Sequence, residues 1–217
     1  MSIQEFASEG YQLHNHAVQR HLASLGLDLR NKSVLELGAG VGDHTQFWLD
    51  RSCNVLAVEG REENVIEFRK RFPQVQMTQF DLDSDYWPFD NYQIIYAYGV
   101  LYHLKDPIMS LNHWAAGCTE LLLLETIVSN RARPHHAKED PNDCRDGLCE
   151  TAVHLPYAEI IKELQLLFEY VYVPERAPQH PEFIDDWANP PVGGYVRGVF
   201  IGTDIEQPND KLRLVQR

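Results

Sequence analysis

The sequence predicts an α/β fold in which a mostly parallel sheet has helices on both faces. Short apolar segments of strand length alternate with segments of helix length along most of the chain, and this alternation is typical of parallel strands joined by helices. A glycine-rich turn follows the first predicted strand, and an acidic residue follows each of the next two. With 217 residues, the chain is long enough for one domain, residues 1–217, to bury its own core.

The first half of the chain contains three predicted strands. Leu13, Val18, Leu22 and Leu25 recur at helical spacing and indicate a leading helix. Pro73 ends the last helix of this half, because the residue before a proline disfavours the helical conformation. In chain order, we expect a helix over residues 3–29, a strand over 33–37, a helix over 43–51, a strand over 54–58, a helix over 61–72 and a strand over 75–80.

The second half contains the remaining strands and two long polar connections. Asp106 and Pro107 form a signal for the start of a helix. The connections, residues 127–156 and 174–194, are long for ordinary loops, so we expect them to cover a binding site, whereas the tail from Asp204 should be loose. In chain order, we expect a strand over residues 92–98, a helix over 107–116, a strand over 119–126, a helix over 156–168, and strands over 169–173 and 195–202.

The composition disfavours several kinds of protein. A net charge of −13 argues against a general nucleic-acid binder, which would present a basic surface. No apolar run approaches the ~20 residues that cross a bilayer, and the first residues lack the basic-then-apolar order of a secretion signal. The four cysteines lack the spacing of a redox pair or a zinc site, so we expect free thiols. The sequence therefore predicts a cytoplasmic protein without a membrane or nucleic-acid partner.

Acidic residues and glycines mark the expected carboxyl ends of the first three strands, where ligands bind in folds of this kind. Residues 34–42 run from a strand into the glycine turn, and Glu36 comes just before that turn. A carboxylate there would repel the pyrophosphate of a dinucleotide, so we expect a cofactor with a positively charged sulfonium and an amino group. Glu59 suits the ribose hydroxyls, and Asp81 suits the adenine amine, with the backbone of Leu82 nearby.

These motifs resemble those of the class I S-adenosylmethionine-dependent methyltransferases over nearly the whole chain. The matching segments are residues 34–43, 57–60, 80–82, 87–95 and 99–107. The resemblance implies a Rossmann-like seven-stranded sheet with strand order 3-2-1-4-5-7-6 and an antiparallel last strand. It also implies transfer of a methyl group from S-adenosylmethionine to an oxygen or nitrogen atom of a small-molecule acceptor. The cofactor-binding residues that follow are Glu36, Gly38, Ala39, Gly40, Glu59, Gly60, Asp81, Leu82 and Tyr98.

The segment after the fourth predicted strand contains the candidate catalytic residues. His103 is the leading general base, because imidazole titrates near neutrality and an acceptor that holds a proton needs a base. The alternative for His103 is packing against the cofactor, and Tyr102 is either a second proton acceptor or a wall residue. The resemblance also implies that residues 1–32 form a helical cap over the cofactor, with Tyr11 or His14 in contact with it.

Several alternatives stay open from the sequence alone. They are an RNA or protein methyltransferase, a non-catalytic protein that binds S-adenosylmethionine, a nicotinamide oxidoreductase, and a homodimeric assembly of any of these. Loop histidines and nearby carboxylates suggest a metal, yet no two of them have ligand spacing on one element, so we expect no metal site. The residues of that alternative are His135, His136, His154, His180, Glu125, Asp140 and Asp143.

Overall fold

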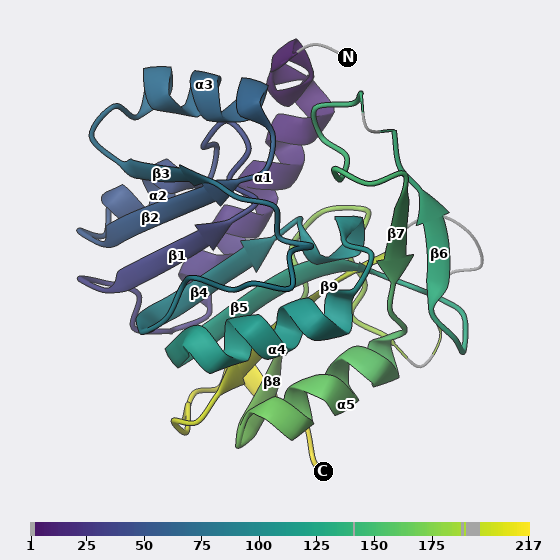
Figure 1. The fold of residues 1–217 in the computed structure, drawn as a ribbon. Helices are drawn as coiled ribbons and strands as arrows, with labels where there is room; N and C mark the ends of the chain where they lie inside the picture. The colour runs from purple at the N-terminus through teal and green to yellow at the C-terminus, as the bar shows by residue number, and fades with distance from the viewer. Residues whose placement is uncertain (1–2, 141, 188, 190–195) are drawn as a thin grey trace.

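The computed structural model describes residues 3–140, 142–187, 189 and 196–217, and its centre is an eight-stranded sheet (Figure 1). The strand order is β10-β8-β9-β5-β4-β1-β2-β3, and β6 and β7 form a separate two-stranded sheet. The strands are β1 (Ser33–Leu37), β2 (Asn54–Glu59), β3 (Gln76–Gln79), β4 (Tyr92–Tyr98), β5 (Cys118–Val128), β6 (His135–Lys138), β7 (Thr151–His154), β8 (Tyr170–Pro174), β9 (Val196–Thr203) and β10 (Leu212–Leu214).

The first five strands of the large sheet run parallel. β1 pairs with β2 and β4, β2 pairs with β3, and β4 pairs with β5. β9 lies between β5 and β8 and is antiparallel to both. The predicted mostly parallel sheet with an antiparallel strand near the end of the chain is confirmed, and β8 and β9 take the places of the predicted sixth and seventh strands. The order differs in detail from 3-2-1-4-5-7-6, because the sheet has eight strands and β10 lies beyond β8.

Two expectations about the second half are wrong. The tail after Asp204 is not loose throughout, because β10 pairs with β8 and buries Leu212. The connection over residues 127–156 is not only a loop, because β6 and β7 form a hairpin within it. These three strands lie in polar segments with no apolar run, so the sequence pattern does not indicate them. Part of the second predicted loop, residues 188 and 190–194, lies outside the described residues. Residue 195, the first of the last predicted strand, does so too.

Helices cover both faces of the sheet (Figure 1). They are η1 (Ile3–Ala7), α1 (Glu9–Ser24), α2 (Thr45–Leu49), α3 (Glu62–Arg71), η2 (Leu101–His103), α4 (Pro107–Gly117) and α5 (Tyr157–Leu167). α1 and α2 bury Leu22 and Trp48 against one face. α4 and α5 bury Trp114 and Ile160 against the other. α3 packs on β2 and β3 through Phe68.

Local signals explain where the helices begin and end. Asp106 caps α4, because its side chain accepts a 2.9 Å hydrogen bond from the Met109 N–H while Pro107 occupies the first turn. The leading helix is shorter than predicted, since Ser8 has an extended backbone between η1 and α1 and Gly26 has a φ of +70° after α1. Within the described part of the chain, no helix combines the length and apolarity needed to span a membrane.

Candidate active site

The carboxyl ends of β1 to β4 border one cavity of about 680 Å³. This volume lies in the range of small-molecule sites, ~300–1,000 Å³. Residues 36–41, 43, 59–61, 64 and 80–83 contribute one side, which we call the glycine half. The arginine half consists of Tyr11, His14, Tyr98, Tyr102, Glu125, His180, Glu182 and Arg197. The residues expected from the sequence all line this cavity: Glu36, Gly38, Ala39, Gly40, Glu59, Gly60, Asp81, Leu82, Tyr98, Tyr102 and His103.

The glycine turn places backbone on the cavity wall with no side chain in the way. Gly38 and Gly42 have φ angles of +65° and +89°, which residues with a Cβ rarely adopt. A Cβ at Gly38 would lie 2.7 Å from Val100 Cγ2, and a Cβ at Gly42 would lie 2.6 Å from Phe72 Cε2. Both the backbone conformation and the available space therefore require glycine at these positions.

Glu36, at the end of β1, is a buried carboxyl group with 2 % of its surface exposed. Its Oε2 accepts a 2.8 Å hydrogen bond from Thr45 Oγ1. Burial raises the pKa of Glu36 to about 8, although the hydrogen bond from Thr45 opposes this shift. A cation in the cavity would favour the ionised form, so this position selects for a positively charged group.

Glu59 and Asp81 present carboxylates at the ends of the next two strands. Glu59 accepts backbone hydrogen bonds from Gly40 at 2.9 Å and from Arg61 at 2.8 Å, one on each oxygen. Burial still raises the pKa of Glu59 above its ordinary value. Asp81 is exposed on the rim, and its Oδ1 accepts a 2.9 Å hydrogen bond from the Asp83 N–H. Since a carboxylate has about four acceptor positions, both groups retain capacity for a ligand.

The residues at and after the end of β4 have different capacities for proton transfer. The hydroxyl of Tyr98 is buried and has no hydrogen-bond partner among the described residues. Tyr102 Oη accepts a 3.1 Å hydrogen bond from Arg197 Nη2. Burial raises the pKa of both phenols, so both stay protonated near neutral pH and suit hydrogen-bond donation better than proton removal. His103 Nδ1 lies 2.7 Å from Glu139 Oε2, which leaves Nε2 for a further partner.

Arg197, on β9, is the centre of a polar cluster that joins the buried Glu125 to the partly exposed Glu182. Its Nη1 donates to both carboxylate oxygens of Glu125, at 3.1 and 3.3 Å, and its Nε donates to Glu182 Oε2 at 2.8 Å. The side chain of Arg197 is 13 % exposed and that of Glu125 is 1 % exposed. His14 Nδ1 lies 3.3 Å from Glu182 Oε2, and the imidazole together with the guanidinium lowers the pKa of Glu182 to about 2. Two carboxylates therefore surround one guanidinium in the arginine half.

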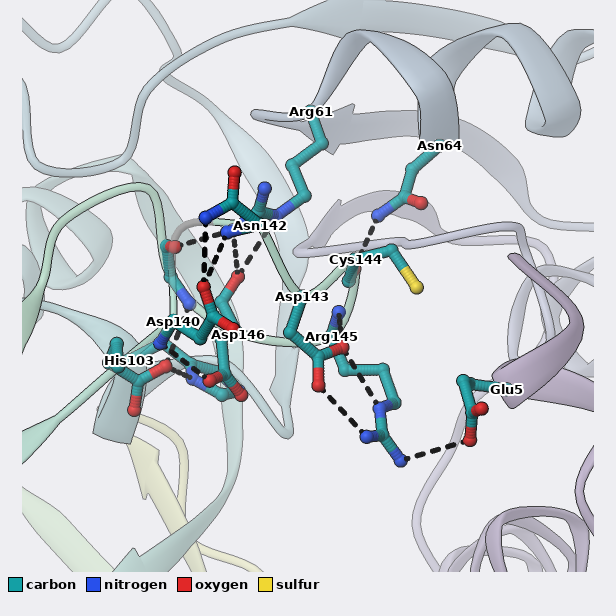
Figure 2. A network of polar contacts seen from close by, with 12 residues as sticks. Glu5, Arg61, Asn64, His103, Asp140, Asn142, Asp143, Cys144, Arg145 and Asp146 are labelled. Atoms are coloured by element: carbon teal, nitrogen blue, oxygen red, sulfur yellow. Dashed lines mark hydrogen bonds and ion pairs between the residues drawn. The ribbon is translucent and has the colours of Figure 1, made fainter. Parts of the chain in front are cut away.

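Residues 139, 140 and 142–148, in the connection between β6 and β7, lie beside the glycine half, and we call them the lid. Arg61 attaches this lid to the start of α3 (Figure 2). Its guanidinium donates to the carbonyl of Asp146 at 3.0 and 3.1 Å and to the carbonyl of Gly147 at 2.6 Å. Leu148 packs so closely on the end of β2 that a Cβ at Gly60 would lie 2.8 Å from Leu148 Cδ1. The lid is therefore docked on the cavity in this structure.

Two further contacts attach the lid to its surroundings (Figure 2). Asn64 Nδ2, on α3, donates a 2.9 Å hydrogen bond to the carbonyl of Cys144. His103, on η2, contacts Glu139, which also accepts the Gly147 N–H at 2.8 Å. These contacts involve both sides of the cavity, so opening of the lid would require several of them to break.

The structure does not join the loop histidines into the metal set considered from the sequence. His135 faces His154 across the β6–β7 hairpin, with ring centroids 5.8 Å apart. His136 is exposed. His180 instead lies beside His14, with ring centroids 5.0 Å apart.

Comparison with known proteins identifies the family. A sequence family described as "Methyltransferase domain" matches residues 9–181, which is well over half of the chain and includes the whole glycine half. The chain belongs to this family. It is an S-adenosylmethionine-dependent methyltransferase, as its motifs predicted. No curated protein matches the chain in sequence.

Solved structures share the fold of this methyltransferase. The N-terminal domain of EvdMO1, in the presence of SAH and D-fucose, has a TM-score of 0.66 and 19 % identity, over 90 % of this chain and 83 % of that one. Magnesium protoporphyrin IX methyltransferase from Synechocystis PCC 6803, with bound SAM, has a TM-score of 0.61 and 16 % identity, over 93 % and 83 %. The 1,6-didemethyltoxoflavin-N1-methyltransferase from Burkholderia thailandensis has a TM-score of 0.61 and 14 % sequence identity, over 91 % of this chain and 80 % of that one. At such identities the likeness establishes the fold alone.

Two residues at the centre of the arginine half of the methyltransferase were not expected from the sequence. Arg197 and Glu182 were not recognised as site residues, and Glu125 was considered only as a metal ligand. One signal existed, because an arginine within the apolar strand β9 is costly to bury unless it is paired. Its partner could not be identified from the sequence, because 72 residues separate Glu125 from Arg197 and no local pattern links them.

Proposed function

We propose that this methyltransferase transfers a methyl group from S-adenosylmethionine to an oxygen or nitrogen atom of a small molecule held in the arginine half. The observation that supports this most is that one cavity of about 680 Å³ includes both halves, so a cofactor in the first has an acceptor site beside it. Glu125 and Arg197 are 1 % and 13 % exposed, so an acceptor must enter a recess to reach them. A recess suits a small molecule better than a nucleic-acid strand or a protein surface.

The cofactor would occupy the glycine half through three carboxylates. Glu36 would pair with the amino group of the cofactor, since burial makes an unpaired charge there unfavourable. Glu59 would accept hydrogen bonds from the ribose hydroxyls, and Asp81 would accept one from the exocyclic amine of adenine. The turn at Gly38 and Gly40 would allow the backbone to approach the cofactor closely.

Three segments would enclose the acceptor within the single domain. They are the N-terminal cap, residues 1–32, and the connections over 127–156 and 174–194. The described parts of all three line the cavity, through Tyr11 and other residues. A closed lid would exclude water, which keeps the reacting groups desolvated and close together.

Methyl transfer is an in-line displacement at the sulfonium methyl group. The acceptor atom forms a bond to the methyl carbon, the carbon–sulfur bond breaks, and S-adenosylhomocysteine leaves. An acceptor hydroxyl loses its proton in this step, and we assign His103 Nε2 as the base that receives it. Glu139, 2.7 Å from Nδ1, would stabilise the resulting imidazolium. Tyr98 and Tyr102 would donate hydrogen bonds to the acceptor.

The solved methyltransferase structures agree with a small acceptor. One was crystallised in the presence of D-fucose and another with bound 1,6-didemethyltoxoflavin. Both molecules are small and polar. The polar side chains of the arginine half fit an acceptor of the same general kind.

A labelled-methyl assay tests the proposal. Protein and S-adenosylmethionine with a labelled methyl group are incubated in parallel with metabolite extract, total RNA and total protein. We expect label in the metabolite fraction, lost with His103→Ala while the affinity for S-adenosylhomocysteine changes by less than about threefold. Label in RNA or protein alone would contradict a small acceptor, and no label in any fraction despite cofactor binding would contradict catalysis.

A further inference from the structure

We propose that His14, His180 and Glu182 bind one divalent transition-metal ion in the arginine half. The metal alternative considered from the sequence included His180 but not His14 or Glu182, because these ligands come from two distant segments, α1 and the connection between β8 and β9. Binding of the ion does not depend on methyl transfer. The consequence for the acceptor, given below, rests on the proposed function.

The geometry of the three side chains suits one ion. One possible ligand atom from each lies within 4.8 Å of the other two. His14 Nδ1 and Glu182 Oε2 are 3.3 Å apart, close to the roughly 3.0–3.4 Å between two ligands that each lie ~2.1 Å from a shared metal. The planes of the His14 and His180 rings make an angle of 87°, so a nitrogen of each ring can point toward the same metal ion.

The hydrogen bonding of the two histidines also leaves room for an ion. His14 Nδ1 is buried and has no hydrogen bond of suitable direction among the described residues. Its nearest acceptor, Glu182 Oε2, already accepts a 2.8 Å hydrogen bond from Arg197 Nε. His180 Nδ1 receives only a long contact, 3.4 Å from the Glu182 N–H. Since buried polar atoms almost always have a well-directed partner, an ion between His14 Nδ1 and Glu182 would satisfy a nitrogen whose contact with that carboxylate is poorly directed.

The residues around the three ligands also suit a cation. Arg197 donates a hydrogen bond to Glu182 Oε2, and outer groups of this kind commonly orient ligand carboxylates. One guanidinium, that of Arg197, pairs with two carboxylates, Glu125 and Glu182. One negative charge is therefore left over to attract a cation. Phe183 stacks on the His14 ring, with centroids 5.6 Å apart, and holds its orientation.

A second group of possible ligands, His103, Glu139 and Asp146, is less suitable. His103 and Glu139 are bonded to each other at 2.7 Å. Asp146 accepts the Asp140 N–H at 2.9 Å. A metal ion there would compete with contacts that hold the lid closed.

The site would define the acceptor more narrowly. His14, His180 and Glu182 all line the cavity, so an ion with three protein ligands keeps open positions toward it. Two imidazoles and a carboxylate suit Zn²⁺, Co²⁺, Fe²⁺ or Mn²⁺. The acceptor class that fits is a small molecule with two neighbouring oxygen atoms, such as a vicinal diol or a hydroxy acid.

Titration of the untagged, full-length protein with Co²⁺ tests the site, because the visible absorption of Co²⁺ reports its ligands. We expect one Co²⁺ ion per chain, bound at least tenfold more weakly by His14→Ala, His180→Ala and Glu182→Gln. His16→Ala is a matched control, because His16 is exposed on the same helix and should leave the affinity unchanged. Zn²⁺ should raise the unfolding temperature of the unaltered protein and not that of Glu182→Gln, which is a second readout in a variant of nearly the same shape.

Three results would overturn the site. They are no Co²⁺ binding, equal affinity in all the variants, and loss of binding with His103→Ala in place of the three ligand variants. The test is separate from that of the proposed function. Normal Co²⁺ binding without methyl transfer contradicts only the proposed function, and methyl transfer without Co²⁺ binding contradicts only the metal site.

Discussion

At the scale of single residues, Glu36 shows how the fold sets the charge of the site. The end of β1 places this carboxyl group at the cavity wall with only 2 % of its surface exposed, and Thr45 gives it one hydrogen bond. Burial raises its pKa to about 8, so much of the unliganded protein carries the neutral form at neutral pH. A ligand with a positive charge binds the ionised form, which couples ligand binding to release of a proton.

This coupling predicts that affinity for S-adenosylhomocysteine increases with pH. The fraction of ionised Glu36 rises as the pH approaches about 8, and only that form pairs with the amino group. We expect calorimetry to show an affinity about tenfold or more higher at pH 8 than at pH 6, and a flat profile for Glu36→Gln. A profile in the variant as steep as that of the unaltered protein would show that another group is responsible.

Arg197 gives a second prediction at this scale. Arg197→Met would leave Glu125 buried and without its partner, which costs about 3–5 kcal/mol of the free energy of unfolding. Urea denaturation measures this loss. Replacing both residues, Arg197→Met with Glu125→Leu, should recover much of the loss, because no buried charge is then left unpaired. Equal losses in the single and double variants would contradict the account of this pair.

The convergence of residues in the glycine half could be predicted from the sequence, but the meeting of Arg197, Glu182 and Glu125 in the arginine half could not. Gly38, Glu59 and Asp81 follow strands that the sequence predicts, and the ends of parallel strands meet at one edge. Their convergence could therefore be expected. Arg197 and Glu182 meet Glu125 only through pairing of β9 with β5 and the path of an irregular connection, which no local pattern records.

At the scale of elements, hydrogen bonds hold the lid in place, whereas apolar packing holds the core together. Arg61 contributes hydrogen bonds to two lid carbonyls and lies outside the main hydrophobic clusters. Arg61→Ala should therefore raise the rate of amide hydrogen exchange in residues 139–148 by about tenfold or more and leave global unfolding nearly unchanged.

A matched variant on the same helix controls this test. Lys70 is 66 % exposed and contacts only Glu67 at 3.0 Å among the described residues, so Lys70→Ala should not affect exchange in the lid. The same exchange rate in Arg61→Ala as in the unaltered protein would mean that other contacts hold the lid.

The last strand provides a prediction about the tail. Leu212 is 7 % exposed in β10, whereas Leu214 in the same strand is 40 % exposed. Leu212→Ala should lower the free energy of unfolding by about 2–3 kcal/mol, and Leu214→Ala by less than about 0.5 kcal/mol. Equal small effects in urea denaturation would show that the tail does not pack on β8.

Long elements were predictable because their patterns extend over several turns or alternations. β1 and β4 occupy the predicted residues, and α4 begins at the predicted Pro107. β6, β7 and β10 were missed because they lie in polar segments with no apolar run, and pairing with a neighbouring strand stabilises them more than the preferences of their own residues do.

At the scale of the whole molecule, the two halves of the cavity have different origins. The parallel strands β1 to β4 supply the glycine half, which the family match includes. The arginine half depends on α1, on β5 and on residues 182 and 197, which lie beyond the matched segment. The family match therefore covers the proposed cofactor site completely, whereas Glu182 and Arg197 of the proposed acceptor site lie outside it.

Calorimetric titration with S-adenosylhomocysteine tests the central claim most directly, which is that the glycine half binds the cofactor. We expect one molecule bound per chain, with affinity at least about tenfold lower in Glu59→Gln and in Asp81→Asn. Asp81 is exposed, so its variant should keep the unfolding temperature of the unaltered protein, and Glu62→Gln, exposed at the start of α3, should bind normally. No binding by the unaltered protein, or equal affinity in all these variants, would contradict the account.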